Sequence, residues 1–192
     1  MTKTLTLKQV IKKYKNCDAC ILHKSAHSYV FYRGDNPPLD ILFIGEAPGN
    51  TEDLYGEPFV GISGELLEQL IKECQNNINI NINCGFTNLV CCRPLDDQGA
   101  LRKPTVQEAM QCSDRLQLTI EACKPHALVL LGRSAASLRK ILYSIDEYPI
   151  LELKHPAHLL RKGGANSFEY QESCLFLEEF IQEHFGNDPL DE

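Results

Sequence analysis

Two cysteines near the start of the chain have a spacing that suits a metal site. Cys17 and Cys20 form a Cys-x-x-Cys pair, which lets two thiolates bind one metal from a single turn. The pair is compatible with zinc, with redox chemistry or with an iron–sulfur cluster, and a metal centre needs further ligands from elsewhere in the fold. Four later cysteines are candidates for those ligands: Cys91, Cys92, Cys112 and Cys123. Three others lack a metal-like spacing, and we expect them to be buried structural residues: Cys74, Cys84 and Cys174.

One histidine and one asparagine occupy positions in or just after apolar runs. His155 follows the run 148–153 and precedes a proline that can fix it. A histidine there can stabilise a developing anion, although a purely structural role is the alternative. Asn88 lies inside the apolar run 86–90. A buried asparagine needs hydrogen bonds, either from neighbouring backbone or from a ligand that offers both donors and acceptors.

A loop rich in turn residues follows another apolar run, 39–44. Six residues punctuate its backbone: Gly45, Pro48, Gly49, Gly56, Pro58 and Gly61. Rigid turns of this kind can aim backbone N–H groups and a few side chains at a ligand. The alternative is an ordinary connection between a strand and a helix. We interpret residues 46–61 as a ligand-binding loop.

Strand-like and helical patterns alternate along the chain and must position these residues. Four apolar runs predict strands: 39–45, 85–91, 127–132 and 148–153. Amphipathic patterns predict five helices: 5–14, 63–73, 105–122, 134–143 and 168–185. This order predicts an α/β fold, a three-layer αβα sandwich with a central four-stranded, mostly parallel sheet. Ligands bind outside the carboxyl ends of such strands, so four loops should meet at one edge: 46–61, 92–103, 132–134 and 154–161.

Length and composition favour one intracellular domain. The 192 residues suit a single well-cored domain, 1–192, with an acidic C-terminal helix and tail at about 166–192. The N-terminus is too polar for a secretory signal, and no long apolar run predicts a membrane span, so we expect a cytoplasmic protein without membrane contact. Nine cysteines in that compartment disfavour a disulfide framework. The asparagine-rich segment 76–83 is predicted to be a loop.

The net charge of −7 hides an uneven distribution. Residues 163–192 contain eight acids and no Lys or Arg, which leaves 18 acids against 19 basic residues in the rest of the chain. Several basic residues fall near the predicted loops: Arg93, Arg102, Lys103, Arg133, Arg139, Lys140, Lys154, Arg161 and Lys162. A nucleic-acid-binding face is one interpretation, and scattered solvated charges are the other.

Taken together, these motifs resemble the uracil-DNA glycosylase superfamily, and specifically its family 4 branch, whose members carry an iron–sulfur cluster. Gly-Glu-Ala-Pro-Gly (45–49), the Glu-Asp pair 52–53 and Gly-Glu-Pro-Phe-Val-Gly (56–61) resemble the family's first motif. Thr-Asn-Leu-Val-Cys-Cys-Arg-Pro (87–94) resembles its central strand, and His-Pro-Ala-His-Leu-Leu-Arg (155–161) its last motif. The resemblance covers residues 17–161. It implies a monomeric enzyme that hydrolyses the N-glycosidic bond of deoxyuridine in single- or double-stranded DNA and leaves an abasic site.

The resemblance also implies a role for each matching residue. Phe59 would stack on the flipped base and Asn88 would read its Watson–Crick edge. Glu46 would hold the base and the attacking water, and His155 would donate to the pyrimidine O2 as negative charge builds on it. Further substrate contacts would come from Ala47, Gly49, Asp53, Ser63, Leu159 and Arg161, and residues 159–161 would enter the DNA helix. A 4Fe–4S cluster, in preference to zinc, would be held by Cys17, Cys20, Cys92 and Cys112, with Cys91 and Cys123 as competing ligands.

Two departures from the family pattern affect the expected mechanism. Ala47 stands where the best-studied branch has an aspartate, so we expect catalysis to depend on stabilising the leaving base rather than on a strong base. The connection 95–103 is longer than usual and lacks the histidine of relatives that trap uracil covalently. Three alternatives stay open: a cluster-bearing DNA-binding protein that has lost catalysis, a glycosylase for another modified base, and a nucleotide-binding domain with structural zinc.

Overall fold

The computed structural model describes residues 4–136, 141–142 and 145–186, and the strands in these ranges form one five-stranded sheet. The strands are β1 (Arg33–Gly34), β2 (Ile41–Gly45), β3 (Cys84–Asn88), β4 (Ala127–Leu131) and β5 (Ile150–Leu153). Their order across the sheet is β1-β3-β2-β4-β5, with β1 antiparallel to β3 and every other pair parallel. The chain passes from β2 to β3 on one side and then to β4 on the other. This topology places the ligand crevice at the carboxyl end of β2.

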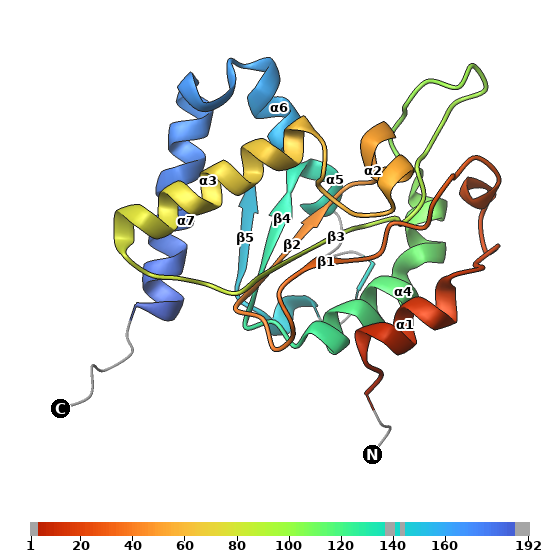
Figure 1. Ribbon diagram of the computed structural model, residues 1–192, viewed down its shortest axis with the longest axis horizontal. Helices are drawn as coiled ribbons and strands as arrows, with labels where there is room; N and C mark the ends of the chain where they lie inside the picture. The colour runs from red at the N-terminus through yellow and green to blue at the C-terminus, as the bar shows by residue number, and fades with distance from the viewer. Residues whose placement is uncertain (1–3, 137–140, 143–144, 187–192) are drawn as a thin grey trace.

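Helices cover both faces of the sheet (Figure 1). The α-helices are α1 (Leu7–Tyr14), α2 (Asn50–Tyr55), α3 (Ile62–Ile78), α4 (Val106–Cys123), α5 (Gly132–Ala136), α6 (Pro156–Arg161) and α7 (Phe168–Phe185). Short 3-10 helices lie at Ile21–Lys24 (η1), Ile145–Glu147 (η3) and Gly164–Asn166 (η4). In Figure 1, α3 and α7 cover one face, whereas α1 and α4 cover the other, so the predicted three-layer αβα sandwich is confirmed. None of the described helices is long and apolar enough to cross a membrane.

The central strands are buried on both faces because their apolar residues alternate between two cores. On β2, Ile41 and Phe43 pack into the core beneath α3 and α7, while Leu42 and Ile44 pack into the core beneath α4. Successive side chains of a strand point to opposite faces, so a continuous apolar run serves a sheet that is covered on both sides. This burial holds the carboxyl end of β2 rigidly between its neighbours.

Side-chain caps mark where α4 and α7 begin. The Thr105 hydroxyl accepts a hydrogen bond from the Glu108 N–H, and the Glu108 carboxylate accepts one from the Thr105 N–H, which forms a capping box at the start of α4. Ser167 caps α7 by accepting from the Tyr170 N–H. Asn79 and Lys124, both left-handed, end α3 and α4.

The structure corrects several expectations. The sheet has five strands rather than four, because the two-residue edge strand β1 is too short to leave an apolar pattern. Helix α3 continues to Ile78, so the predicted loop 76–83 starts three residues late, at Asn79. Two loops expected at 46–61 and 154–161 contain the short helices α2 and α6. Of the helix predicted at 134–143, residues 134–136 belong to α5, residues 141–142 are not helical, and residues 137–140 and 143 lie outside the described residues.

Candidate active site

A cleft of about 660 Å³ opens at the carboxyl ends of β2 to β5. Its lining comes from residues 46–49 after β2, 94 and 101–103 after β3, 132–134 after β4, and 154–155, 157–158 and 161 after β5. All four loops predicted to meet at one edge therefore contribute to it. Five basic side chains line the cleft together with one carboxylate, Glu46: Arg102, Lys103, Arg133, Lys154 and Arg161. Despite the acidic net charge of the chain, this cleft is suited to a phosphate-bearing ligand.

Phe59 and Asn88 meet just behind the cleft wall, at Gly45. A Cβ atom placed on Gly45 would lie 2.5 Å from Asn88 Oδ1 and 2.6 Å from Phe59 Cζ, so only glycine leaves room for both side chains. Phe59 is 6% exposed and Asn88 is 3% exposed. Within the described part of the chain, the side-chain amide of Asn88 forms no hydrogen bond, although a buried amide needs partners. Its donor and acceptor are thus available to a ligand.

The backbone at Phe59 is held in an unusual conformation by distant residues. Phe59 has φ 57°, a left-handed value that is uncommon for a bulky residue. Arg33 on β1 donates from Nε to the Pro58 carbonyl (2.8 Å) and from Nη2 to the Phe59 carbonyl (3.0 Å). Gly64 on α3 lets the helix approach closely, because a Cβ there would lie 1.9 Å from the Phe59 carbonyl oxygen. These contacts aim the Phe59 ring, whose centroid lies 6.4 Å from that of His155.

His155 is the N-cap residue of α6, and this position fixes its protonation. Its Nδ1 accepts a hydrogen bond from the Ala157 N–H (3.1 Å), so the neutral ring carries its proton on Nε2. Burial lowers the pKa of His155 below its ordinary value, and the Glu46 carboxylate partly offsets that effect. Gly132, with φ +84°, passes so close that a Cβ there would lie 3.0 Å from the His155 Cβ. At neutral pH the ring is therefore an uncharged hydrogen-bond donor.

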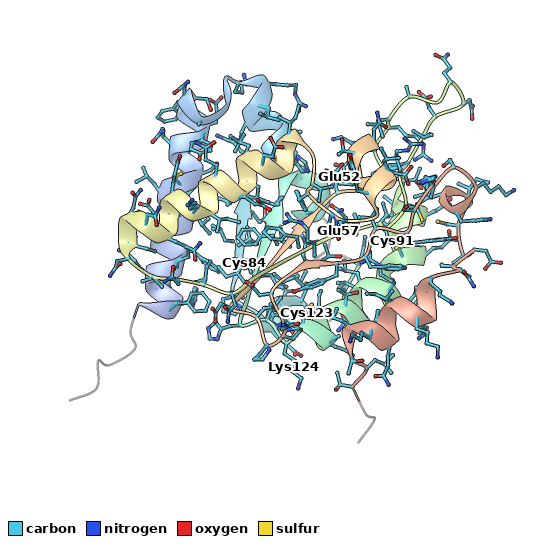
Figure 2. All side chains as sticks on the ribbon, in the orientation of Figure 1. Glu52, Glu57, Cys84, Cys91, Cys123 and Lys124 are labelled. Atoms are coloured by element: carbon cyan, nitrogen blue, oxygen red, sulfur yellow. The ribbon has the colours of Figure 1, made fainter. Side chains whose placement is uncertain are left out.

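The loop after β2 is closed by a carboxylate bridge. Glu52 accepts from the Gly49 N–H (3.1 Å) and from the Gly61 N–H (2.9 Å), so the two ends of the loop are tied to one side chain. Glu52 belongs to α2, and Figure 2 places it at this end of the molecule. Glu46, Ala47 and Gly49 line the cleft at the start of the same loop.

Three residues predicted to contact substrate lie elsewhere. Asp53 is 1% exposed, and its carboxylate accepts from the N–H groups of His27 (2.9 Å) and Ser28 (3.1 Å) and pairs with Arg93 Nε (3.2 Å). Leu159 is 2% exposed and packs into the core beneath α3 and α7. Ser63 lies in the first turn of α3 and is not among the residues that line the cleft. Both Asp53 and Leu159 are buried by protein contacts in this structure.

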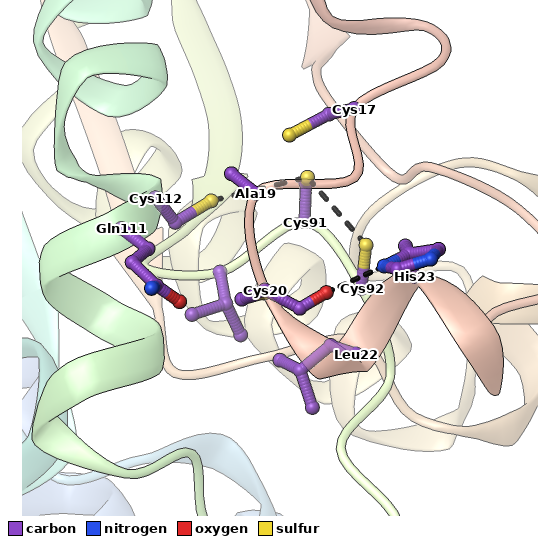
Figure 3. Close-up of a pocket in the computed structure, with 10 residues that line it drawn as sticks. Cys17, Ala19, Cys20, Leu22, His23, Cys91, Cys92, Gln111 and Cys112 are labelled. Atoms are coloured by element: carbon purple, nitrogen blue, oxygen red, sulfur yellow. Dashed lines mark hydrogen bonds between the residues drawn. The ribbon is translucent and has the colours of Figure 1, made fainter.

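Five cysteines line a second, smaller pocket between the N-terminal segment, the end of β3 and α4 (Figure 3): Cys17, Cys20, Cys91, Cys92 and Cys112. The Cys91 sulfur lies 3.9 Å from those of Cys92 and Cys112. Among the described residues, no three potential ligands converge tightly enough to enclose a single metal ion. The structure thus brings together all four predicted ligands and the competitor Cys91.

The other competitor, Cys123, lies far from this pocket. It ends α4, eleven residues and about 16 Å of helix beyond Cys112. It is fully buried, and burial raises the pKa of its thiol to about 12. Figure 2 shows Cys91 and Cys123 well apart. Cys123 therefore has the position and the protonation of a structural cysteine.

Sequence reasoning missed two arginines that support the site. Arg33 belongs to the short strand β1, which left no detectable pattern. Arg115 lies among apolar residues of α4 and donates to the carbonyl oxygens of Asn88 and Leu89 (2.7 and 2.8 Å). The one available signal for Arg115 was a charged residue next to the apolar positions Leu116 and Ile120 of a helix.

Comparisons with known proteins identify a family and several relatives. A family model described as the uracil DNA glycosylase superfamily matches residues 31–182. The Type-4 uracil-DNA glycosylase of Archaeoglobus fulgidus is 34% identical over 160 residues, which cover 83% of this chain and 76% of that protein. The Thermotoga maritima Type-4 uracil-DNA glycosylase is 36% identical over 173 residues, 83% of this chain and 86% of the relative. For the Saccharolobus solfataricus Type-4 enzyme the figures are 38% over 128 residues, 67% of this chain and 56% of the relative, so the chain spans just over half of that protein.

Proposed function

Because this chain belongs to the uracil DNA glycosylase superfamily, we propose that it is a glycosylase that hydrolyses the N-glycosidic bond of deoxyuridine in DNA and leaves an abasic site. The observation that carries this proposal is that the side chains of Phe59 and Asn88 both pack against Gly45, with the Phe59 ring centroid 6.4 Å from that of His155. An aromatic face, an unpaired amide and a neutral donor are what a flipped uracil requires. That the protein acts as a cytoplasmic monomer stays a prediction from its sequence.

The target base would leave the DNA stack and reach Phe59 and Asn88 behind the cleft wall. Phe59 would stack on the base, and the Asn88 amide would bond to the uracil N3–H and O4, which are a donor and an acceptor. Since both side chains are nearly buried, the loop 46–61 must open slightly to admit the base. The basic side chains that line the cleft would hold the flanking phosphates, with Arg161 of α6 exposed on the rim.

His155 would stabilise the departing base. As the glycosidic bond breaks, negative charge builds on the pyrimidine O2, and a neutral Nε2–H donor directed at that oxygen lowers the barrier by about 3 kcal/mol. The bond from Ala157 to Nδ1 keeps the proton on Nε2. Glu46 is the single carboxylate among the residues that line the cleft, and it would orient the attacking water. With Ala47 beside it instead of a second carboxylate, the reaction depends mainly on leaving-group stabilisation.

Asp53 and Leu159 take different roles in this proposal from those the sequence predicted. Asp53 positions the loop through His27, Ser28 and Arg93, and Leu159 anchors α6 in the core. The residues that reach the DNA from this side of the cleft are then Arg161 and, in part, Leu160.

We also propose that the cysteine pocket holds a 4Fe–4S cluster, with Cys17, Cys20, Cys92 and Cys112 as its ligands. Two observations favour such a group here: five thiols line the pocket, and the buried Nε of Arg115 beside it has no partner among the described residues. When bound, a cluster would tie the N-terminal segment to α4 and to the end of β3, because its ligands come from all three. Cys91 competes with Cys92 for one ligand position.

The direct test is a cleavage assay with anaerobically purified protein. A single-stranded oligonucleotide with one uracil should be cut at that position after alkali treatment, and a panel of other modified bases would define specificity. Asn88→Ala should lower kcat/KM by about 100-fold, since a buried amide matched to a base edge discriminates strongly. Asn76→Ala, at an exposed position of α3, is the matched control and should leave activity unchanged. Protein that contains the cluster but leaves every base intact would overturn the proposal.

A further inference from the structure

Arg115 is a buried cation with no carboxylate partner among the residues that the structure describes. It is 1% exposed. Its guanidinium donates to Thr87 Oγ1 (3.2 Å), to the carbonyl oxygens of Asn88 and Leu89, and to Cys112 Sγ (3.5 Å). In the part of the chain that the structure describes, Arg115 forms no ion pair with Asp or Glu, and its Nε has no hydrogen-bond partner. An unpaired buried charge is costly, so a negative charge is expected next to it.

Other arginines of the protein show how unusual this is. Three arginines that are more exposed than Arg115 each pair with a carboxylate: Arg33 with Glu68, Arg93 with Asp53 and Arg102 with Glu108. Arg102 bonds to Glu108 of α4, whereas Arg115 is itself a residue of α4. Arg115 is thus more buried than Arg102, yet it has no carboxylate partner among the described residues, whereas Arg102 pairs with Glu108.

The cysteine pocket is the place where that missing anion would lie. Arg115 already contacts the sulfur of Cys112, which lines the pocket. Thiol ligands lose their protons when they bind metal, and a cluster held by four thiolates carries net negative charge. A cluster in the pocket would therefore pair with Arg115 at short range in a medium of low dielectric constant, where the attraction is strong.

Arg115 also contacts the backbone of Asn88, the residue that would read the base. Its Nη2 donates to the Asn88 carbonyl, and Asn88 is only four residues before Cys92 on one continuous segment. The same guanidinium therefore contacts the cysteine pocket and the residue that would read the base. Thr87, which is also bound to Arg115, in turn donates to the Phe31 carbonyl (2.6 Å), so this end of β3 is fixed on both sides.

We propose that Arg115 is the buried counter-charge of the cluster and a positioning residue that couples the occupied cysteine pocket to Asn88. This inference rests on the proposed function, because it needs both the cluster and a catalytic role for Asn88. Arg115 touches neither DNA nor base. It acts through the backbone at residues 88 and 89 and through the electrostatic environment of the thiolates.

Two substitutions separate the charge of Arg115 from its hydrogen bonds, and both are made in the full chain. Arg115→Gln removes the charge but keeps a donor. Arg115→Lys keeps the charge but cannot span the Asn88 and Leu89 carbonyls and the Cys112 sulfur at once. Thr119→Val, one turn further along α4 and equally buried, is the control for disturbance of that helix. The measurements are the rate at which visible cluster absorption decays with chelator in air, and kcat and KM on uracil-containing single strands for fully loaded enzyme.

We expect Arg115→Gln to lose its cluster about 10- to 100-fold faster than Thr119→Val, as is typical when a partner of metal ligands is removed. Arg115→Lys should lose its cluster at nearly the wild-type rate. Its kcat should nevertheless fall about tenfold with little change in KM, because the Asn88 backbone is no longer held. Cluster loss from Arg115→Gln at the Thr119→Val rate would overturn the counter-charge role. Wild-type kcat in Arg115→Lys would overturn the positioning role. If Arg115→Gln is insoluble, rapid cluster loss from Arg115→Lys contradicts the counter-charge role by itself.

Failure of the proposed function would give a different result. If wild-type protein holds the cluster but cleaves no base, the decay measurement still tests the counter-charge role. If wild-type protein assembled with iron and sulfide shows no cluster absorption, the proposed cofactor is wrong and the inference falls with it.

Discussion

The two walls of the cleft are held in place in different ways. The loop 46–61 depends on side chains remote in sequence: Arg33 holds the carbonyls of Pro58 and Phe59, and Asp53 ties the loop to residues 27–28 and to Arg93. At 155–161 the side chain of His155 is held locally, because it accepts from the Ala157 N–H of its own helix, while Leu159 packs that helix against the core beneath α3 and α7. Remote substitutions should thus disturb the first wall, whereas the second should respond mainly to local ones.

The largest effect is expected at the wall 155–161. His155→Ala should lower kcat by about 100- to 1000-fold, the usual loss when one donor to a developing oxyanion is removed. Because His155 belongs to its own cap, the substitution should leave the Phe59 loop and the cysteine pocket undisturbed, with KM and cluster absorption near wild type. His126→Ala, at the amino end of β4 on the opposite edge of the sheet, is the control. A His155→Ala enzyme of near-normal kcat would refute leaving-group stabilisation by this residue.

The next prediction tests how much the loop 46–61 depends on the buried carboxylate of Asp53. Asp53→Asn should reduce the free energy of unfolding by about 2 kcal/mol, because it removes the buried charge that Arg93 and the two N–H groups need. Asp114→Asn, at an exposed position of α4, should change stability by less than about 0.5 kcal/mol. Urea unfolding of both variants measures the difference. Equal stability of the two variants would mean that Asp53 does not anchor the loop.

A smaller effect is expected from Arg33, which holds the loop backbone at Pro58 and Phe59. Arg33→Ala removes two charged hydrogen bonds to the loop backbone, and we expect kcat/KM to fall about tenfold as the Phe59 ring loses its fixed orientation. Glu68→Gln removes the ion pair of Arg33 but not its bonds to the loop, so it should keep nearly full activity. If both variants lose activity equally, the ion pair rather than the loop contact is what matters.

The same contrast explains which parts of the site could be predicted from sequence. The αβα layers follow from apolar runs such as those of β2 and β4, and the edge that carries the loops follows from the parallel order. His155 could be found because its own neighbours hold it. Arg33 could not, since a two-residue strand has no periodicity and its partners lie 25 and 26 residues away.

Local sequence patterns also do not determine which motif residues are buried. Asp53 and Leu159 stand in motifs that contain cleft residues, yet tertiary packing turns both inward. A carboxylate surrounded by loop N–H groups, or a leucine on the inner face of a one-and-a-half-turn helix, looks the same in sequence as an exposed one. The choice between Cys112 and Cys123 was open for the same reason, because which end of α4 faces the pocket is a property of the fold.

The smallest expected effect is a shift in the pKa of His155, which charges on both walls influence. Burial sets that pKa below 6.5, and charges on both walls adjust it: Glu46 raises it and Arg161 lowers it. Catalysis needs the neutral ring, so kcat/KM should rise with pH through this pKa and be level by neutral pH. Glu46→Gln should move the acid limb to lower pH and Arg161→Gln to higher pH, each by less than about one unit. The Arg161 shift should shrink at high salt, because that side chain is exposed and screened whereas the histidine is not. Midpoints that move in the same direction in both variants would mean that the acid limb reports some group other than His155.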